Sequence, residues 1–124
     1  MSTTAEATQE LNKWLDRTMR GTLLGLSSRI IVSTPVDTGR LRSNWQASFN
    51  TPKDEELSRT DSMSPITEAK QATMDMSVGN DFFLTNNLSY AYPIEFDGTS
   101  KQAPSGMLRV NVTALAQALR DAAK

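Results

Sequence analysis

The sequence contains no cysteine and no histidine. Without cysteine it has no disulfides, thiolate ligands or thiol nucleophiles, and without histidine it lacks the imidazole ligand and the commonest general base. No serine stands three residues before a lysine, the spacing that places a lysine beside a serine on a helix. Asp37, Glu95 and Asp97 are the acids that could serve in acid and base catalysis or as oxygen ligands of Mg²⁺. We expect instead that Asp37 caps a turn and that Glu95 pairs with an arginine. The sequence therefore predicts no enzyme, no cofactor, and no catalytic or metal-binding residue.

An excess of charge of either sign is also missing, because 13 basic residues stand against 14 acidic ones. A net charge of -1 provides no global field to attract a polyanion, which disfavours a nucleic-acid binder driven by basic tails. The charges are unevenly distributed, with acidic residues concentrated in 46–100 and an excess of basic residues on either side. The acidic middle of one copy could pair with the basic ends of another, or the pattern could be an ordinary solvated surface.

Long apolar runs are absent as well. The longest fairly apolar stretch without charge, 21–28, is far shorter than the roughly 20 residues that span a bilayer, and the first residues lack the pattern of a secretory signal. We predict neither a membrane segment nor export by that route. A length of 124 residues with 38% hydrophobic residues predicts one domain, covering 1–124.

The clearest predicted element is a helix over 5–33, where apolar residues recur at spacings of three and four. Thr3 and Glu6 have capping-box spacing, and the residue before Pro35 should leave the helix. Such a helix would be roughly 40 Å long. Either it crosses the whole domain, or the end that carries Trp14 is left over to bury against another chain.

A tight corner is predicted directly after this helix. Pro35 fixes its own backbone angle, Asp37 is expected to hold the turn, and Gly39 to adopt an angle that a side chain would resist. From Trp45 to Phe49 apolar and polar residues alternate, which predicts a half-buried strand.

The rest of the chain predicts several shorter elements. We expect a mobile loop or hairpin tip near 51–64, a helix or a return strand over 66–76, and a strand over 82–87. One or two helical turns should follow, with Pro93 in the first turn, and a helix over most of 105–123 should begin near Pro104. The predicted fold is α+β, with a long N-terminal helix and a C-terminal helix packed on a small antiparallel sheet.

Three segments together resemble a known family. They are Pro-Val-Asp-Thr-Gly-Arg-Leu-Arg-Ser-Asn-Trp at 35–45, Asn-Asn-Leu-Ser-Tyr-Ala-Tyr-Pro-Ile-Glu-Phe at 86–96, and Ser-Lys-Gln-Ala-Pro-Ser-Gly-Met-Leu-Arg at 100–109. Their order and spacing resemble the tail-completion or neck family of long-tailed double-stranded DNA bacteriophages, often labelled minor tail components. One departure is Asp97, which stands before Gly98 where the family often has the glycine directly after the Glu-aromatic pair.

The resemblance implies a structural role in the virion. Copies made in the host cytoplasm would assemble, as a six-fold ring, between the head-completion or portal-side ring and the tail tube or terminator protein. DNA would pass through this ring without specific binding. Alternatives are a tail terminator or minor tail protein elsewhere in the tail, and a small DNA-binding module outside the virion.

Several residues are candidates for the surface between subunits. Tyr90, Tyr92 and Phe96 form either a cover for the sheet or an aromatic patch that docks on the next subunit. Arg40 and Arg42 either contact a partner or bracket the core residue Leu41. The full set of interface candidates is Trp14, Arg40, Arg42, Tyr90, Tyr92, Glu95 and Phe96, beside the turn residues Pro35, Asp37 and Gly39.

Overall fold

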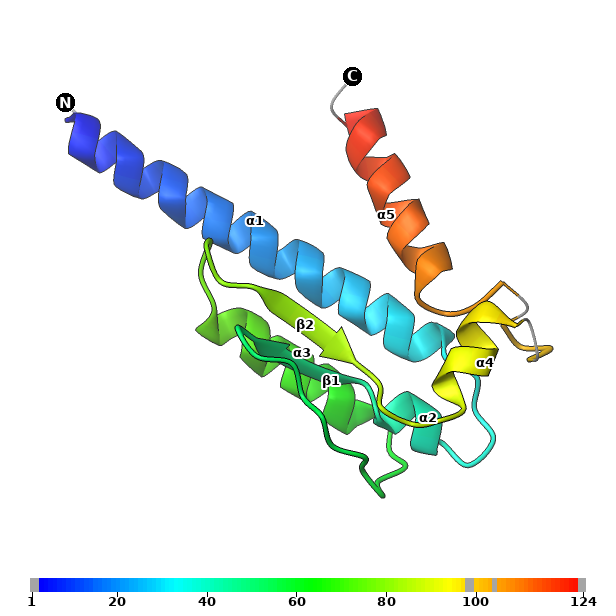
Figure 1. The fold of residues 1–124 in the computed structure, drawn as a ribbon. Helices are drawn as coiled ribbons and strands as arrows, with labels where there is room; N and C mark the ends of the chain where they lie inside the picture. Colours follow the sequence, from blue (N-terminus) through cyan, green and yellow to red (C-terminus); the bar gives the residue numbers. More distant parts are fainter. Residues whose placement is uncertain (1–2, 98–99, 104, 123–124) are drawn as a thin grey trace.

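The computed structural model describes residues 3–97, 100–103 and 105–122. The predicted α+β fold is confirmed, with a long N-terminal helix, a C-terminal helix and a two-stranded antiparallel sheet (Figure 1). Gly98 and Pro104, which entered the sequence predictions, lie outside the described residues. The elements are α1 (Thr4–Ser33), α2 (Arg40–Ser43), β1 (Gln46–Phe49), α3 (Met63–Asp75), β2 (Phe82–Thr85), α4 (Ala91–Phe96) and α5 (Arg109–Ala122).

The long helix α1 starts and stops where the sequence predicts. Its N-cap Thr3 accepts a hydrogen bond from the Glu6 amide at 3.1 Å, and the Glu6 carboxylate accepts one from the Thr3 amide at 3.2 Å, which completes the capping box. Thr34 ends the helix in an extended conformation before Pro35. At 30 residues α1 is about 45 Å long.

The rest of the domain covers only part of α1. Every residue from 3 to 15 is exposed, and the first tertiary hydrogen bond along the helix is made by Asp16, which accepts from the Val78 amide at 2.8 Å. Figure 1 shows the N-terminal part extending beyond α3 and the sheet. The interpretation in which α1 simply crosses the whole domain is therefore wrong.

The sheet consists of β1 and β2 in antiparallel register, with Gln46 opposite Thr85 and Phe49 opposite Phe82. Trp45 and Ala47 are buried as the alternation predicts, but Gln46 and Ser48 on the other face are buried as well. The predicted strand is confirmed, but its burial pattern is wrong: Gln46 and Ser48 are buried, and Phe49, expected on the buried face, is 37% exposed. The segment after β1 folds back over this face, and its carbonyl groups satisfy the buried polar side chains.

This covering segment, 51–62, has no regular secondary structure but is tied down along its length. The Gln46 amide donates to the Glu55 carbonyl at 2.7 Å, and the Ser48 hydroxyl donates to the Thr51 carbonyl at 2.7 Å. Asn44, fully buried, exchanges hydrogen bonds with both backbone groups of Leu57. The segment is a loop and not a hairpin tip, and hydrogen bonds to buried side chains hold it against the body.

We call residues 51–59 of this covering segment the strap. The chain after the covering segment forms helix α3, which decides between the helix and the return strand predicted as alternatives for 66–76. Its small residues Ala69 and Ala72 are buried and allow close packing on β1 and α1. Arg20 of α1 donates two hydrogen bonds to the Met76 carbonyl, at 2.9 and 3.1 Å, just after the helix ends. The helix that lies directly along the sheet is thus α3.

The main core lies where α1, α2, α4 and the start of α5 meet. Trp45 is its largest side chain, 4% exposed, and its indole N–H donates to the Thr34 hydroxyl at 2.7 Å. Leu41 is buried beside it, as expected of the residue between the two arginines. The buried members are Ile30, Ile31, Leu41, Trp45, Leu88, Ala91 and Met107.

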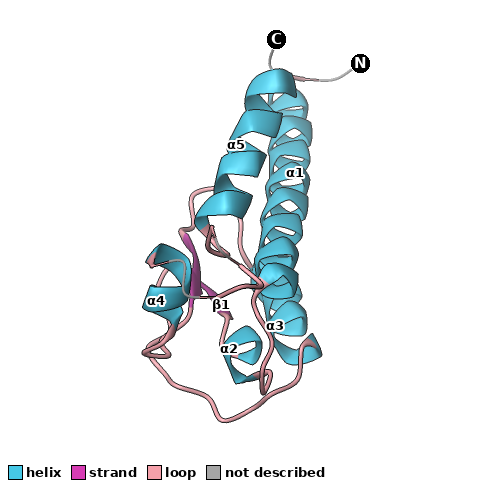
Figure 2. Cartoon of the chain, turned by 90° about the vertical axis from the view of Figure 1, so that its right-hand side faces the viewer, coloured by secondary structure: helices cyan, strands magenta, loops and turns pink. Residues whose placement is uncertain are grey.

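The C-terminal helix begins at Arg109, four residues later than the start expected at 105. Gly106 has a φ of +89°, a left-handed backbone that interrupts any helix through this point. Helix α5 starts beside α1 and leads away from the rest of the domain (Figures 1 and 2), and Figure 1 shows that its far end diverges from the N-terminal part of α1. None of its described side chains is buried.

Candidate interaction surface

The three family-like segments, far apart in the sequence, meet at one end of the molecule. The Asn86 side chain donates to the Leu41 carbonyl at 2.8 Å, which joins the second segment to the first. The Gln102 side chain accepts from the Val36 amide at 3.1 Å and donates to the Val36 carbonyl at 3.3 Å, which joins the third to the first. Segments that the sequence singled out separately thus form one hydrogen-bonded junction.

The turn that opens the first segment depends on Gly39. Its φ is +90°, and a Cβ added there would collide with the Thr60 carbonyl oxygen, so glycine is required twice over. The prediction for Gly39 is confirmed. The prediction for Asp37 is wrong, because the hydroxyl of Thr38 accepts from the Arg40 amide at 3.3 Å while the Asp37 side chain is exposed.

Glu95 of α4 holds the start of α5. The side chain is 5% exposed, and its carboxylate accepts hydrogen bonds from the backbone amides of Met107, Leu108 and Arg109 at 2.7 to 2.8 Å. These amides have no partner within the helix, so the carboxylate caps α5 from another element. The expected arginine partner is Arg109, whose Nε lies 3.1 Å from Oε1.

The electrostatics of Glu95 follow from this geometry. Burial works to raise its pKa, but the amide hydrogen bonds from Leu108, Arg109 and Met107 together with the Arg109 side chain outweigh burial and hold the pKa below its usual range. The start of α5 also offers the positive end of a helix dipole. Glu95 is therefore an ionised structural carboxylate at neutral pH, which we call the Glu95 latch.

Beside the latch, aromatic and cationic side chains gather on the surface. The Tyr92 and Phe96 rings lie 4.6 Å apart between centroids, and the Arg109 guanidinium carbon lies 4.5 Å above the Phe96 ring. Tyr92 is 65% exposed and Phe96 49%, so the interpretation of these aromatics as a cover for the sheet is wrong. Tyr90 is exposed too, at the edge of a different pocket.

The Tyr92–Phe96–Arg109 patch borders a hollow of about 320 Å³, whose apolar lining includes Trp45, Leu84 and Met107. Exposed aromatic and arginine side chains next to an apolar hollow are the composition enriched at protein–protein interfaces. The patch is therefore suited to receive a protein partner.

The other interface candidates lie elsewhere. Arg40 donates to the Leu57 carbonyl at 3.0 Å, and Arg42 donates to the carbonyls of Val32 and Thr34 at the end of α1. Both guanidinium groups thus bind backbone carbonyls inside the domain. Trp14 is 56% exposed on the projecting part of α1, away from the patch.

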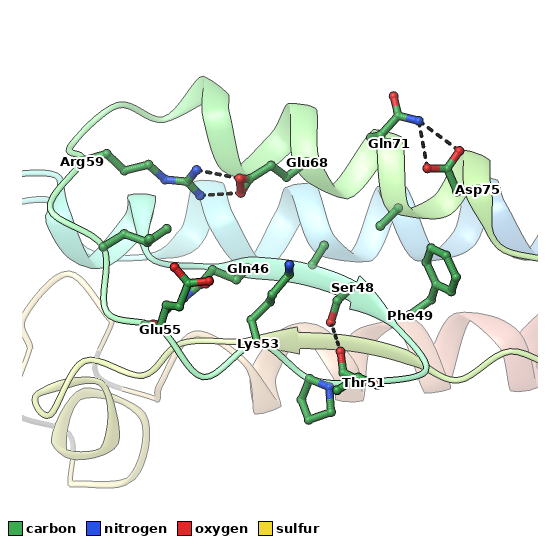
Figure 3. Close-up of a pocket in the computed structure, with 14 residues that line it drawn as sticks. Gln46, Ser48, Phe49, Thr51, Lys53, Glu55, Arg59, Glu68, Gln71 and Asp75 are labelled. Atoms are coloured by element: carbon green, nitrogen blue, oxygen red, sulfur yellow. Dashed lines mark hydrogen bonds and ion pairs between the residues drawn. The ribbon is translucent and has the colours of Figure 1, made fainter.

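A larger groove of about 590 Å³ lies between β1, α3 and the 51–59 strap (Figure 3). Four of its lining side chains are paired: Arg59 and Glu68 form a bidentate ion pair at 2.6 and 2.7 Å, and Gln71 donates to Asp75. The hydrogen bond to Glu68 raises the pKa of Arg59. The Arg59–Glu68 pair links the strap to α3.

Comparisons with known proteins identify no relative of this chain. No family model matches the chain, and neither a curated protein nor a solved structure is significantly similar to it. Within the described residues, no helix is long and apolar enough to cross a bilayer, and no three acidic side chains come close enough to hold a metal ion.

Sequence reasoning missed three residues that build this surface. Gly106 lets the chain pass close to Glu95, since a Cβ there would lie 2.7 Å from both the Glu95 carbonyl oxygen and Oε2. Arg109 supplies the cation of the patch, and Asn44 holds the strap. The available signal was the Ser-Gly-Met-Leu-Arg run at 105–109, just before a predicted helix. The first amides of a helix have no partner within it, so a carboxylate from another element can bind them.

Proposed function

We propose that this chain is a structural virion protein of a long-tailed double-stranded DNA bacteriophage. Copies of it form a ring in the neck, six-fold as the family resemblance implies, between the portal-side head-completion ring and the tail. DNA passes through the ring, and the protein acts by assembly rather than by catalysis.

The observation that carries this proposal is the junction of the three family-like segments. Hydrogen bonds from Asn86 and Gln102 tie the segments together, and the Glu95 latch fixes α5 beside them. A resemblance spread over three short runs is more specific when the same runs build one local structure. The junction also presents the Tyr92–Phe96–Arg109 patch, which has the composition of a docking surface.

The alternative of a DNA-binding module outside the virion has less support. Of its three candidate cations near Trp45, Arg40 and Arg42 are bound to backbone carbonyls of Leu57, Val32 and Thr34, while Arg29 is exposed on α1. Duplex binding needs cations that reach phosphates. The near-zero net charge gives no additional attraction.

The test is electron microscopy of lysates from a phage that carries this gene with an early stop codon. Filled heads beside separate, finished tails would support the neck assignment, and complementation by the intact gene should restore joined particles. Tails that are missing or irregular in length would favour a terminator or minor tail role instead. Normal infectious particles would overturn the virion assignment.

A further inference from the structure

The outer edge of β2 has no strand beside it. Within the described part of the chain the sheet consists of β1 and β2 alone. The Asn50 amide donates to the Asp81 carbonyl at 2.7 Å in the register of the ladder, so the next bonded residue of β2 is Phe83. The amides and carbonyls of Phe82 and Leu84 therefore point away from β1. Among the described residues, no hydrogen bond to these four groups is found.

This edge also lacks most of the features by which proteins protect a free strand. Residues 82–85 contain no proline and no charged side chain, and the pairing with β1 continues without a bulge. Only the short length of β2, four residues, limits what can pair with it. The edge can therefore accept another strand through Phe82 and Leu84.

The hollow of about 320 Å³ beside the aromatic patch lies at this edge. Its lining includes Leu84 and the following residues 85–87, together with Trp45, Met107 and side chains of α4. Directly opposite residues of two paired strands have their side chains on the same face of the sheet. The residue of an added strand that lies opposite Leu84 would therefore direct its side chain beside Leu84, into the hollow.

The lining of the hollow favours an uncharged, apolar side chain. Within the described lining the one charged residue is Glu95, and its carboxylate already accepts hydrogen bonds from three amides and from the Arg109 side chain. The side-chain amides of Asn86 and Asn87 donate to backbone carbonyls. A phosphate or a charged side chain would find no partner inside the hollow, whereas an apolar side chain would be removed from water there.

We propose that an extended strand of a partner protein adds to the outer edge of β2, antiparallel to it, and inserts an apolar side chain into the hollow. The unpaired main-chain groups determine this occupant, because an extended strand has N–H and C=O groups at the matching spacing, whereas those of a helix are bonded internally. Antiparallel pairing is the more stable arrangement for each residue. The proposal rests on the proposed function only in taking the hollow and the patch as the docking surface.

The probe is the peptide acetyl-Thr-Leu-Thr-Val-Thr-amide, added to the isotope-labelled intact chain. In antiparallel pairing its leucine lies opposite Leu84 and its valine opposite Phe82. Nuclear magnetic resonance should show that the amides of these two residues shift and, at saturation, exchange with solvent at least about tenfold more slowly. The Phe83 amide, which faces β1, should change less.

Two N-methylated forms of the peptide provide the matched control. Methyl groups on the leucine and valine nitrogens block the edge that faces β2, and methyl groups on the nitrogens of the second and third threonines block the opposite edge. Each form carries two methyl groups, so the two differ only in which edge is blocked. The form blocked toward β2 should bind at least about tenfold more weakly than the other.

Equal affinities of the two methylated forms would overturn the proposal. So would unchanged Phe82 and Leu84 amides at peptide concentrations up to about 5 mM. Because the experiment uses purified protein, it is independent of the lysate test. Peptide bound at the edge with normal particles from the stop-codon phage would reject the virion role alone, whereas separated heads and tails without peptide binding would reject strand addition alone.

Discussion

Arg109 binds Glu95 at two places, with Nε 3.1 Å from the carboxylate and a terminal guanidinium nitrogen 2.5 Å from the Glu95 backbone carbonyl. The Arg109 amide also donates to the same carboxylate at 2.7 Å. One residue thus contacts the backbone and the side chain of the other. The first turn of α5 and the last turn of α4 are thereby held as one unit.

The substitution Glu95→Gln should destabilise the protein by about 2 kcal/mol, because the amide that replaces the carboxylate accepts weaker hydrogen bonds and leaves Arg109 without its ion pair. Urea unfolding at pH 7 measures the change, and hydrogen exchange should show lost protection first in α5. The matched control is Glu56→Gln on the exposed strap. Equal losses in the two variants would contradict the latch.

The same carboxylate should make stability depend on pH. The folded-state pKa of Glu95 lies below its ordinary value of 4.5, so the unfolded chain takes up the proton more readily. The stabilisation is complete above the ordinary value and is lost as the pH falls through the lowered one. The difference in unfolding free energy between the native chain and Glu95→Gln should therefore shrink between about pH 5 and pH 2. A constant difference over this interval would show that Glu95 is not the group responsible.

Gly106→Ala should destabilise by about 2 kcal/mol, because the backbone there is left-handed and the added Cβ meets the Glu95 carbonyl. Gly25→Ala in α1 is the control, since no atom lies within 4 Å of its added Cβ. That change should stabilise by about 0.5–1 kcal/mol. Thermal melting of both variants checks the pair, and a neutral Gly106→Ala would refute the close approach.

Tyr92→Ala should weaken assembly more than folding. The side chain is 65% exposed, so the stability of the isolated chain should change by no more than about 0.5 kcal/mol. Because Tyr92 belongs to the docking patch, removing its side chain should lower the affinity of the chain for its assembly partner at least about tenfold. Thermal melting and light scattering provide the two readouts. A melting temperature that falls in parallel with assembly would mean that Tyr92 supports the fold instead.

Asn44→Ala should free the 51–59 strap. The buried Asn44 side chain donates to the carbonyls of Arg40 and Leu57 and accepts from the Leu57 amide, so its removal leaves buried backbone groups unsatisfied at about 2–3 kcal/mol. Limited proteolysis should then cut within 51–59 well before the rest of the chain. Unchanged cleavage would mean that the other contacts of the strap, such as those of Gln46 with Glu55 and of Arg59 with Glu68, hold it without Asn44.

The sequence predicts correctly the features that depend on interactions between residues close together in the chain. The capping box at Thr3 and Glu6, the stop before Pro35 and the left-handed Gly39 all depend on neighbours within a few residues. The sequence of 66–76 does not decide between a strand and a helix, because its small apolar residues suit either until β1 and α1 are placed against them.

The wrong predictions have a common physical origin, because they depend on contacts between residues that are far apart in the sequence. Gln46 and Ser48 look like solvent-facing residues of a strand, and only the return of the strap buries them. Tyr92 and Phe96 resemble core residues by type, and only the direction of α4 exposes them. The sequence predicts that Glu95 pairs with an arginine, but it does not distinguish Arg109 from the other arginines.

The Glu95 latch has a mechanical consequence for α5. Since no described side chain of α5 is buried, the helix is a rigid rod held at one end. A rotation of about 10° at that pivot moves the far end of a rod about 21 Å long by about 4 Å. Because the latch sets the direction of the first turn of α5, it also sets the position of the far end of the helix.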